Sequence, residues 1–302
     1  MPLTAFPPAL LSLPILSGIA FAFIGIAYRR GQQRGLTALH IVFHMGLWGA
    51  VFFALGTGPE RWTEAPMIIL TLGLVGGITQ WLTAILIGWA LRLGPLSPMW
   101  CALNLTFLPV TLHSAVMFHE PVPPVKIAGL GLAVATVILA SLRTRDPEDE
   151  PSQLVSAPLY GLLLVALLLF NSVMHVSIKH LGTVEISEGE TLMTAFGPVF
   201  FTCLYVALLI PIAVQHALQR DRRALSRRGW VWGSVAGIGS IGGVGFLALS
   251  ASLPGAVVFT LSAVFSILGA GIASVTLFGE QANRIWFAMM GAAVASVVLV
   301  SL

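Results

Sequence analysis

Amide, indole and hydroxyl side chains lie inside long apolar runs of the sequence, and they are the residues that could bind a small solute. A polar side chain in such a run is costly unless it faces water, a ligand or a partner. Several follow one another at steps of three or four, which places them on one face of a helix. We interpret that face, with neighbours on the preceding run, as the wall of a binding site. The set is Gln80, Trp81, Trp100, Asn104, Phe107 and Thr111.

This set also has a structural interpretation, because polar residues commonly join helices in membranes. Trp100 and Phe107 would then pack in the core, and Asn104 would hydrogen-bond a neighbouring helix. The residue types and their spacing leave both interpretations open.

A second set of polar residues lies later in the chain. Asn171 and His175 are four residues apart and share a helix face, so they could bind a solute, relay a proton or make structural hydrogen bonds. Ser262 and Ser266 repeat this spacing on another run. Serine also satisfies backbone carbonyls and permits close helix packing, so packing is the favoured role for this pair, with binding as the alternative.

Histidines raise the question of metal and proton chemistry. His40 and His44 are four residues apart, a spacing that can hold a metal ion on a helix. His44 and His175 are the candidates for proton coupling. No carboxylate lies in the middle of an apolar run to neutralise a divalent cation. We therefore expect no resident metal and no cofactor, and a divalent-metal transporter using the histidines is a less favoured alternative.

The composition predicts an all-α polytopic membrane protein, with the lipid bilayer as its environment. Of 302 residues, 57% are hydrophobic and 9% charged, and the net charge of +3 comes from loop arginines, which argues against nucleic acid as a partner. A membrane-spanning helix needs about 20 apolar residues. Ten runs fit this length, at 10–28, 36–56, 66–91, 98–118, 125–142, 159–180, 191–218, 230–252, 255–278 and 285–302.

The sequence contains a tandem duplication. Residues 71–142 align without a gap on residues 231–302, and most positions of 131–142 are identical to those of 291–302. Glu120 and Glu280 fall at matching helix ends, where we expect a structural or gating role. The duplication predicts a first five-helix repeat at 1–145, a linker at 146–155 and a second repeat at 156–302.

Five crossings per repeat make the second copy enter the membrane from the opposite side. The fold class predicted is therefore ten transmembrane helices arranged as two inverted five-helix repeats, which is typical of transporters. One set of alternate loops holds twelve of the 15 Lys and Arg residues, so we expect those loops in the cytoplasm and both termini outside. The expected location is the inner (plasma) membrane of a bacterium, as a monomer or a homodimer.

Several features resemble the EamA-type repeat of the drug/metabolite transporter superfamily. They are Pro109 inside its run, the helix end Phe118-His119-Glu120, the Gly129-x-Gly131 helix, and the second-copy helix end Leu277-Phe278-Gly279-Glu280. The resemblance implies a ten-helix carrier with a central cavity, often an exporter of amino acids or other metabolites. Members of the family usually have both termini in the cytoplasm, and the arginine count predicts the reverse here.

The expected function is a secondary transporter, in the export direction, of small neutral or zwitterionic metabolites such as amino acids. Transport would occur by alternating access, either as proton antiport or as facilitated diffusion. No Lys or Arg lies at mid-depth in a run, which argues against phosphate or dicarboxylate substrates, and no glycine-rich nucleotide loop is present. The alternative is a membrane receptor or an integral-membrane enzyme, although we expect no enzyme because that interpretation leaves the duplication unexplained.

Overall fold

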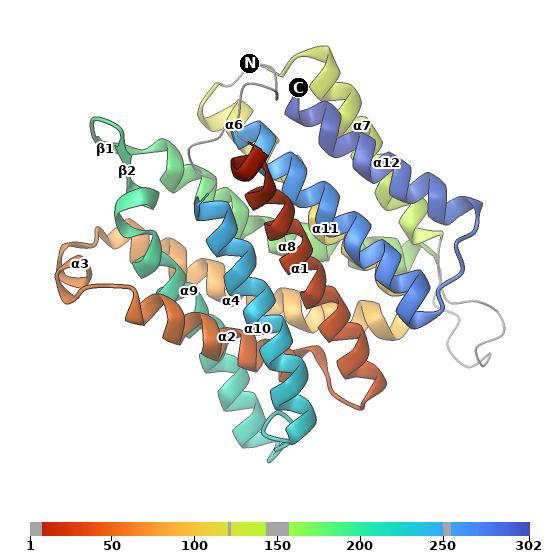
Figure 1. Cartoon of the computed structure of the whole chain (residues 1–302), viewed down its shortest axis with the longest axis horizontal. Coiled ribbons are helices and arrows are strands. Elements are labelled where there is room, and N and C mark those ends of the chain that lie inside the picture. The colour runs from red at the N-terminus through yellow and green to blue at the C-terminus, as the bar shows by residue number, and fades with distance from the viewer. Residues whose placement is uncertain (1–7, 120–121, 143–156, 250–254) are drawn as a thin grey trace.

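The computed structural model describes residues 8–119, 122–142, 157–249 and 255–302 (Figure 1). Nine helices in these ranges are long and apolar enough to cross a membrane, and the shorter apolar helix Arg284–Val300 accompanies them. The predicted all-α membrane protein is therefore confirmed at this level. Glu120 and the linker 146–155 lie outside the described residues.

The helices coincide with the predicted apolar runs to within a few residues. In the first half these are α1 (Pro8–Gln33), α2 (Ala38–Leu55), α4 (Met67–Leu93), α5 (Leu96–Asn104), α6 (Phe107–Met117) and α7 (Pro124–Ser141). In the second half they are α8 (Ala157–Thr183), α9 (Leu192–Leu218), α10 (Arg227–Leu249), α11 (Gly255–Phe278) and α12 (Arg284–Ser301).

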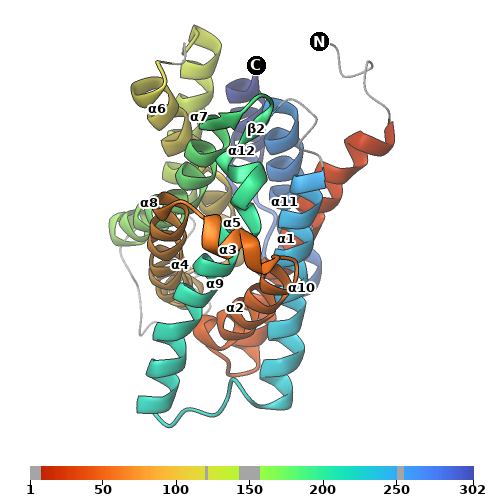
Figure 2. The same ribbon diagram turned by 90° about the vertical axis from the view of Figure 1, so that its left-hand side faces the viewer.

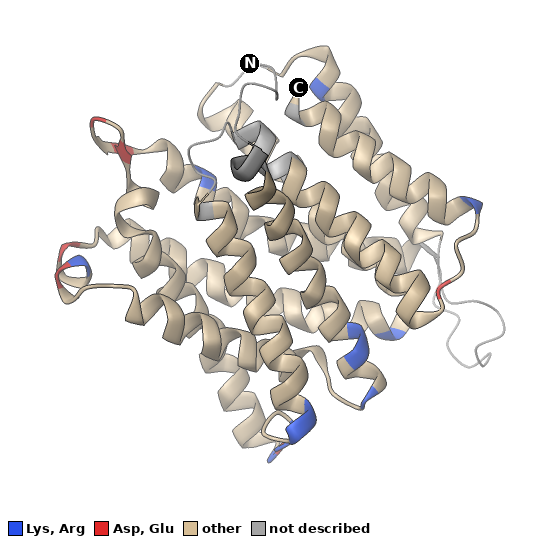
Figure 3. Ribbon diagram, in the orientation of Figure 1, with Lys and Arg blue, Asp and Glu red and all other residues tan. Residues whose placement is uncertain are grey.

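Two small elements between the long helices were not predicted. Helix α3 (Pro59–Glu64) begins with proline, whose fixed φ suits the first helical turn. A hairpin of β1 (Glu185–Ser187) and β2 (Glu190–Thr191) turns through Gly189, whose φ of 76° favours glycine. Both lie at the end of the bundle opposite most of the arginines (Figure 3).

The fourth apolar run, a single candidate span at Leu96–Met117, consists of two helices, α5 and α6, instead of one continuous helix. Pro109 explains the break, because proline has no N–H to donate and its ring conflicts with the carbonyl four residues earlier, that of Leu105. Leu105 leaves helical geometry, with φ −86° and ψ 14°. Its carbonyl instead accepts the N–H of Leu108 at 3.0 Å, in a tighter turn.

The two halves of the chain interleave. Helix α1 packs mainly on α10 and α11 of the second half, whereas α8 packs on α4, α5 and α6 of the first (Figures 1 and 2). Between them α4 lies against α9, α10 against α2, and α2 against α9, while α7 pairs with α12. The buried core therefore consists of contacts between the halves as much as within them.

Close approach of these helices depends on glycines in α4 and α10. A Cβ on Gly73 would lie 2.8 Å from Cys203 of α9, and one on Gly77 would collide with the Leu204 carbonyl oxygen. At the matching positions, a Cβ on Gly233 would lie 2.5 Å from the His44 Cβ, and one on Gly237 would lie 2.7 Å from the Trp48 ring. Glycine thus permits helix packing at distances that no other residue allows.

Charged side chains collect at two ends of the bundle. Figure 3 shows most Lys and Arg along the lower and right-hand edge and most acidic residues at the left. We call the first the arginine end; it holds the ends of α1 and α4, the loop after α1, the segment between α9 and α10, and the start of α12 (Figure 3). These segments contain Arg29, Arg30, Arg34, Arg92, Arg220, Arg222, Arg223, Arg227, Arg228 and Arg284. The first turn of α1 and the last turn of α12 lie away from it (Figure 1).

We predict that Gly77→Ala destabilises the protein, because the added methyl group meets the backbone of α9. Overpacking of this kind costs about 1–3 kcal/mol. Gly131→Ala is the matched control, since a Cβ there has no neighbour within 4 Å and alanine favours the helix by about 1 kcal/mol. Thermal unfolding of the detergent-solubilised proteins measures both. Equal unfolding midpoints for the two variants would show that the packing of α4 on α9 does not require glycine at position 77.

Candidate functional site

A group of amide side chains meets at the break between α5 and α6, and we call Gln80, Asn171 and the Leu103 carbonyl the amide node. Asn171 of α8 donates from Nδ2 to the Leu103 carbonyl at 3.1 Å. Its Oδ1 accepts the amide N–H of Gln80, from α4, at 3.0 Å. Leu103 lies in the last turn of α5, where carbonyls lack helical partners. The node therefore pairs a carbonyl at the break and joins three helices.

His175 and Asn104 flank the amide node. His175 lies one turn from Asn171 on α8, and its Nδ1–H donates to the Asn171 carbonyl at 3.1 Å, which leaves Nε2 as an acceptor. Asn104 donates from Nδ2 to the carbonyl of Trp100 at 2.8 Å, within its own helix. Gln80, Asn104 and the pair Asn171 and His175, predicted from three separate runs, are thus brought to one region.

Hydroxyl groups join α1, α10 and α11 in a second cluster, the serine node, formed by Ser17, Ser262 and the Gly243 carbonyl. The Ser17 hydroxyl donates to the Gly243 carbonyl at 2.8 Å and lies 3.1 Å from the Ser262 Oγ. All of these hydrogen bonds are buried. A membrane interior strengthens the need for such pairing, because no water can replace it.

Trp100 joins α5 to α11 one turn away from Ser262 of the serine node. Its indole N–H donates to the Ser266 hydroxyl of α11 at 3.0 Å, and both side chains are buried. Its ring also covers Gly25 of α1, where a Cβ would lie 3.0 Å from the ring. Trp100 and Ser266 are therefore sealed in the contact between α1, α5 and α11.

The remaining predicted wall residues are not joined to these nodes. Trp81 is half-buried against the core, and its buried indole nitrogen has no hydrogen-bond partner among the described residues. Thr111 is half-buried on α6. The side chain of Phe107 lies outside the described part of the chain.

Glu280, at the end of α11, caps the start of α5. Its Oε2 accepts the Ser97 hydroxyl at 2.7 Å and the Ser97 N–H at 3.3 Å, and its Oε1 accepts the N–H of Leu96. Pro95, at the cap position of α5, offers no side-chain acceptor. A carboxylate is favoured at a helix N-terminus, where N–H groups are unpaired. Glu280 therefore ties α11 to α5 at the arginine end.

A cluster that was missed from the sequence joins α2 to the loop after α9. Asp221 accepts a hydrogen bond from His40 Nε2 at 3.0 Å and from Arg223 Nη2 at 2.6 Å. The Arg223 guanidinium, with a smaller effect of His40, holds the pKa of Asp221 well below its usual range. The His216 ring stacks on His40 at 4.8 Å. Sequence spacing could not predict this cluster, because His40 and Asp221 are 181 residues apart.

The ligand atoms of His40, His216 and Asp221 lie within 4.8 Å of one another, as they could around a metal ion. The hydrogen bonds disfavour that use. His40 Nδ1 accepts the Thr37 N–H at 2.8 Å, so Nε2 must carry the proton and cannot offer its lone pair. His44 is separate, because its Nε2–H donates to the Ala224 carbonyl at 2.8 Å. His40 and His44 thus donate from Nε2 to different acceptors, Asp221 and the Ala224 carbonyl.

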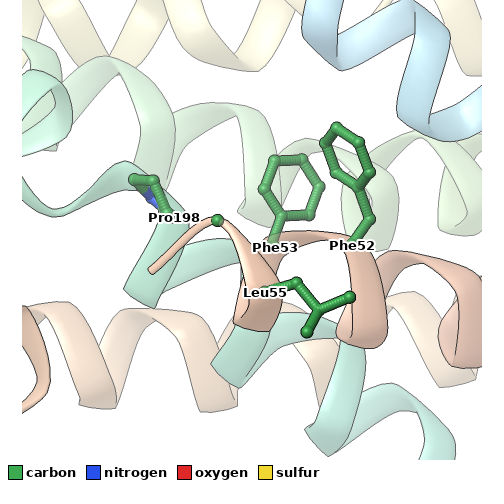
Figure 4. Close-up of a pocket in the computed structure, with 5 residues that line it drawn as sticks. Phe52, Phe53, Leu55 and Pro198 are labelled. Carbon is green, nitrogen blue, oxygen red and sulfur yellow. The ribbon is translucent and has the colours of Figure 1, made fainter. Parts of the chain in front are cut away.

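The contact between α2 and α9 opens toward the end opposite the arginines. A hollow of about 500 Å³ lies where α2 ends and α9 begins, lined by apolar side chains and one glycine. Figure 4 shows the side chains on the end of α2 beside the ring of Pro198. The lining residues are Phe52, Phe53, Leu55, Gly56 and Pro198.

We predict that Glu280→Gln loosens the contact of α5 with α11, because the amide has one acceptor oxygen in place of two and no charge, so it cannot keep the hydrogen bonds of both Leu96 and Ser97. Loss of hydrogen bonds to a charged group, worth about 1.5–3 kcal/mol, raises an open population about tenfold or more. Cys101 of α5, which is 1% exposed, reports this through its rate of maleimide labelling in a Cys203→Ser background. Glu185→Gln, on the exposed hairpin, is the control. An unchanged labelling rate in Glu280→Gln would rule the cap out as a closing contact.

We predict that alanine variants of the two amide residues lower the free energy of unfolding by different amounts. Asn171→Ala leaves both the Leu103 carbonyl and Gln80 without their partner, at roughly 1–3 kcal/mol, whereas Gln80→Ala breaks only the bond between the two amides. The double variant is predicted to be less destabilised than the sum of the single variants. Unfolding of all three proteins in detergent tests this, and strict additivity would show that the amides do not interact.

Comparison with known proteins shows similarity at the level of the fold. No family model matches the chain, and no curated protein matches it. A solved structure described as "Crystal structure of protein" superposes with a TM-score of 0.61 at 16% sequence identity, covering 97% of this chain and 96% of that chain. The chain therefore shares its fold with a known structure over nearly its whole length.

Proposed function

We propose that the protein is a secondary transporter for a small neutral or zwitterionic metabolite, built from two inverted five-helix repeats that span the membrane ten times. The observation that carries the proposal is the symmetry of its helix packing. Exchanging each helix for its counterpart in the other half reproduces the major contacts, as the interchange of two repeats requires.

The correspondence can be followed pair by pair. The contact of α1 with α10 corresponds to that of α8 with α4, and the contact of α4 with α9 to that of α10 with α2. The contact of α1 with α11 corresponds to that of α8 with α5 and α6. The α2–α9 and α7–α12 pairs each map onto themselves. Glycines 160 residues apart occupy the corresponding interfaces, Gly73 with Gly233 and Gly77 with Gly237.

The two polar nodes obey the same correspondence. The amide node joins α8 to α4 and α5, and the serine node joins α1 to α10 and α11, their counterparts. Both nodes are electrically neutral. The described Lys and Arg residues lie at helix ends and in loops, so no fixed charge is available to bind an anionic substrate in the interior. A neutral or zwitterionic solute is therefore favoured, with amino acids as the leading class.

Alternating access is supported by the unequal contacts of the broken helix. Its half α5 packs against α11, where Glu280 bridges the two at the arginine end and Trp100 bridges them at Ser266, in the middle of α11. Its other half, α6, packs mainly on α8. We place the arginine end in the cytoplasm, because positive loops are retained there. In this proposal the contact of α5 with α11 closes the pathway on the cytoplasmic side.

Uptake into proteoliposomes tests the function. The labelled panel holds neutral amino acids, small amines, nucleosides and divalent metals, each with and without an imposed pH gradient. We expect saturable uptake of a neutral solute; a response to the gradient would identify proton coupling. Uptake restricted to metals, or no saturable uptake of any solute, would overturn the proposal.

Variants of the candidate wall then locate the pathway. Trp100→Ala and Asn104→Ala are expected to reduce the transport rate at least severalfold, because both side chains border the contact that has to open. Trp89→Ala is the matched control, since Trp89 of α4 is exposed on the outer surface of the bundle. The yield of folded protein is compared by gel filtration. Wild-type transport kinetics in both variants would show that this helix face does not line the pathway.

A further inference from the structure

The α9–α10 loop and the first turn of α10 concentrate positive charge that no described residue outside this segment neutralises. Residues 220–228 include five arginines and one acidic residue, Asp221. Asp221 is already paired with Arg223. The other four arginine side chains are exposed, and none has an ion pair within the described part of the chain; they are Arg220, Arg222, Arg227 and Arg228.

The backbone of this loop is held firmly in place. Ala224 is buried, and its carbonyl accepts the Nε2–H of His44. Ser226 accepts the N–H of Gly229 at 3.1 Å and donates to the Arg223 carbonyl at 2.6 Å. Arg223 also donates to the Gly35 carbonyl of the preceding loop. The arginines therefore extend from a fixed surface, so binding an anion would cost little ordering of the backbone.

Large apolar side chains border the arginines. Leu218 is 80% exposed, Leu225 60% and Trp230 41%. Tryptophan is enriched where the hydrocarbon meets the headgroups, and leucines exposed at this level contact lipid chains. The loop lies with the other arginine-bearing loops at one end of the bundle (Figure 3). Exposed guanidinium groups and exposed large apolar side chains are therefore neighbours in this segment.

We propose that this surface, formed by Arg220, Arg222, Arg227 and Arg228 with Leu218, Leu225 and Trp230, binds an anionic phospholipid. Guanidinium groups pair with a phosphate through two parallel hydrogen bonds, and the leucines and the indole contact the acyl chains. A soluble anion would use only the first of these interactions. The inference does not depend on the transport function.

Binding is measured on the whole purified protein in neutral detergent, by titrating phosphatidylglycerol or phosphatidylcholine and recording bound lipid by native mass spectrometry. We expect phosphatidylglycerol to bind more tightly. The variant Arg222→Gln/Arg227→Gln/Arg228→Gln should lose about fivefold in affinity for each arginine, or about 100-fold in all. The same positions changed to lysine should keep much of the preference, because the charge remains.

Arg284→Gln is the matched control, because it removes one exposed arginine from the same end of the bundle but outside the loop. It should leave phosphatidylglycerol binding unchanged. Equal binding of the two lipids, or an unchanged affinity in the triple glutamine variant, would overturn the proposal. Competition by glycerol phosphate at the concentration of the lipid would show a soluble-anion site, which would also overturn it.

Discussion

A peptide group released from a helix inside a membrane must find a partner within the protein, since hydrocarbon offers none. Pro109 creates this requirement, because the break it causes ends α5 at Asn104 and leaves carbonyls of the last turn without helical partners. Asn171 meets it by donating to the Leu103 carbonyl, and Gln80 in turn satisfies Asn171. One proline thereby fixes the relative position of α4, α5 and α8. The rest of the candidate site, from His175 to Trp100, is arranged around that point.

The helix interfaces are of two physical kinds. Those of α4 with α9 and α10 with α2 are close contacts at glycines, against the backbone of α9 and against the His44 and Trp48 side chains of α2, and they leave little room for adjustment. The interface of α5 with α11 is instead bridged by long side chains, Glu280 and Trp100, whose hydrogen bonds can be exchanged for others. Motion of the bundle is therefore expected where side chains bridge helices, with the glycine-packed pairs moving as rigid units.

Hydropathy predicted the spans well because length and apolar content alone determine whether a helix crosses a membrane. The break at Leu105 was not predicted, although Pro109 was noted within its run, since a proline in a membrane helix can also produce only a kink. The meeting of Gln80 with Asn171 follows from the interleaving of the halves, and helix periodicity carries no information on such contacts. For the same reason His40 was paired with its neighbour His44, while its partner, Asp221, lies in a distant loop.

The interleaved packing also bears on how the chain is assembled during synthesis. Helix α1 is synthesised long before the helices against which it packs most extensively, α10 and α11. The Ser17 hydroxyl acquires its partners, Gly243 and Ser262, only at that stage. A nascent chain of five helices thus holds polar groups in lipid until the second half arrives. Translation order and packing order differ, and the early helices must remain in the membrane unassembled for most of the synthesis.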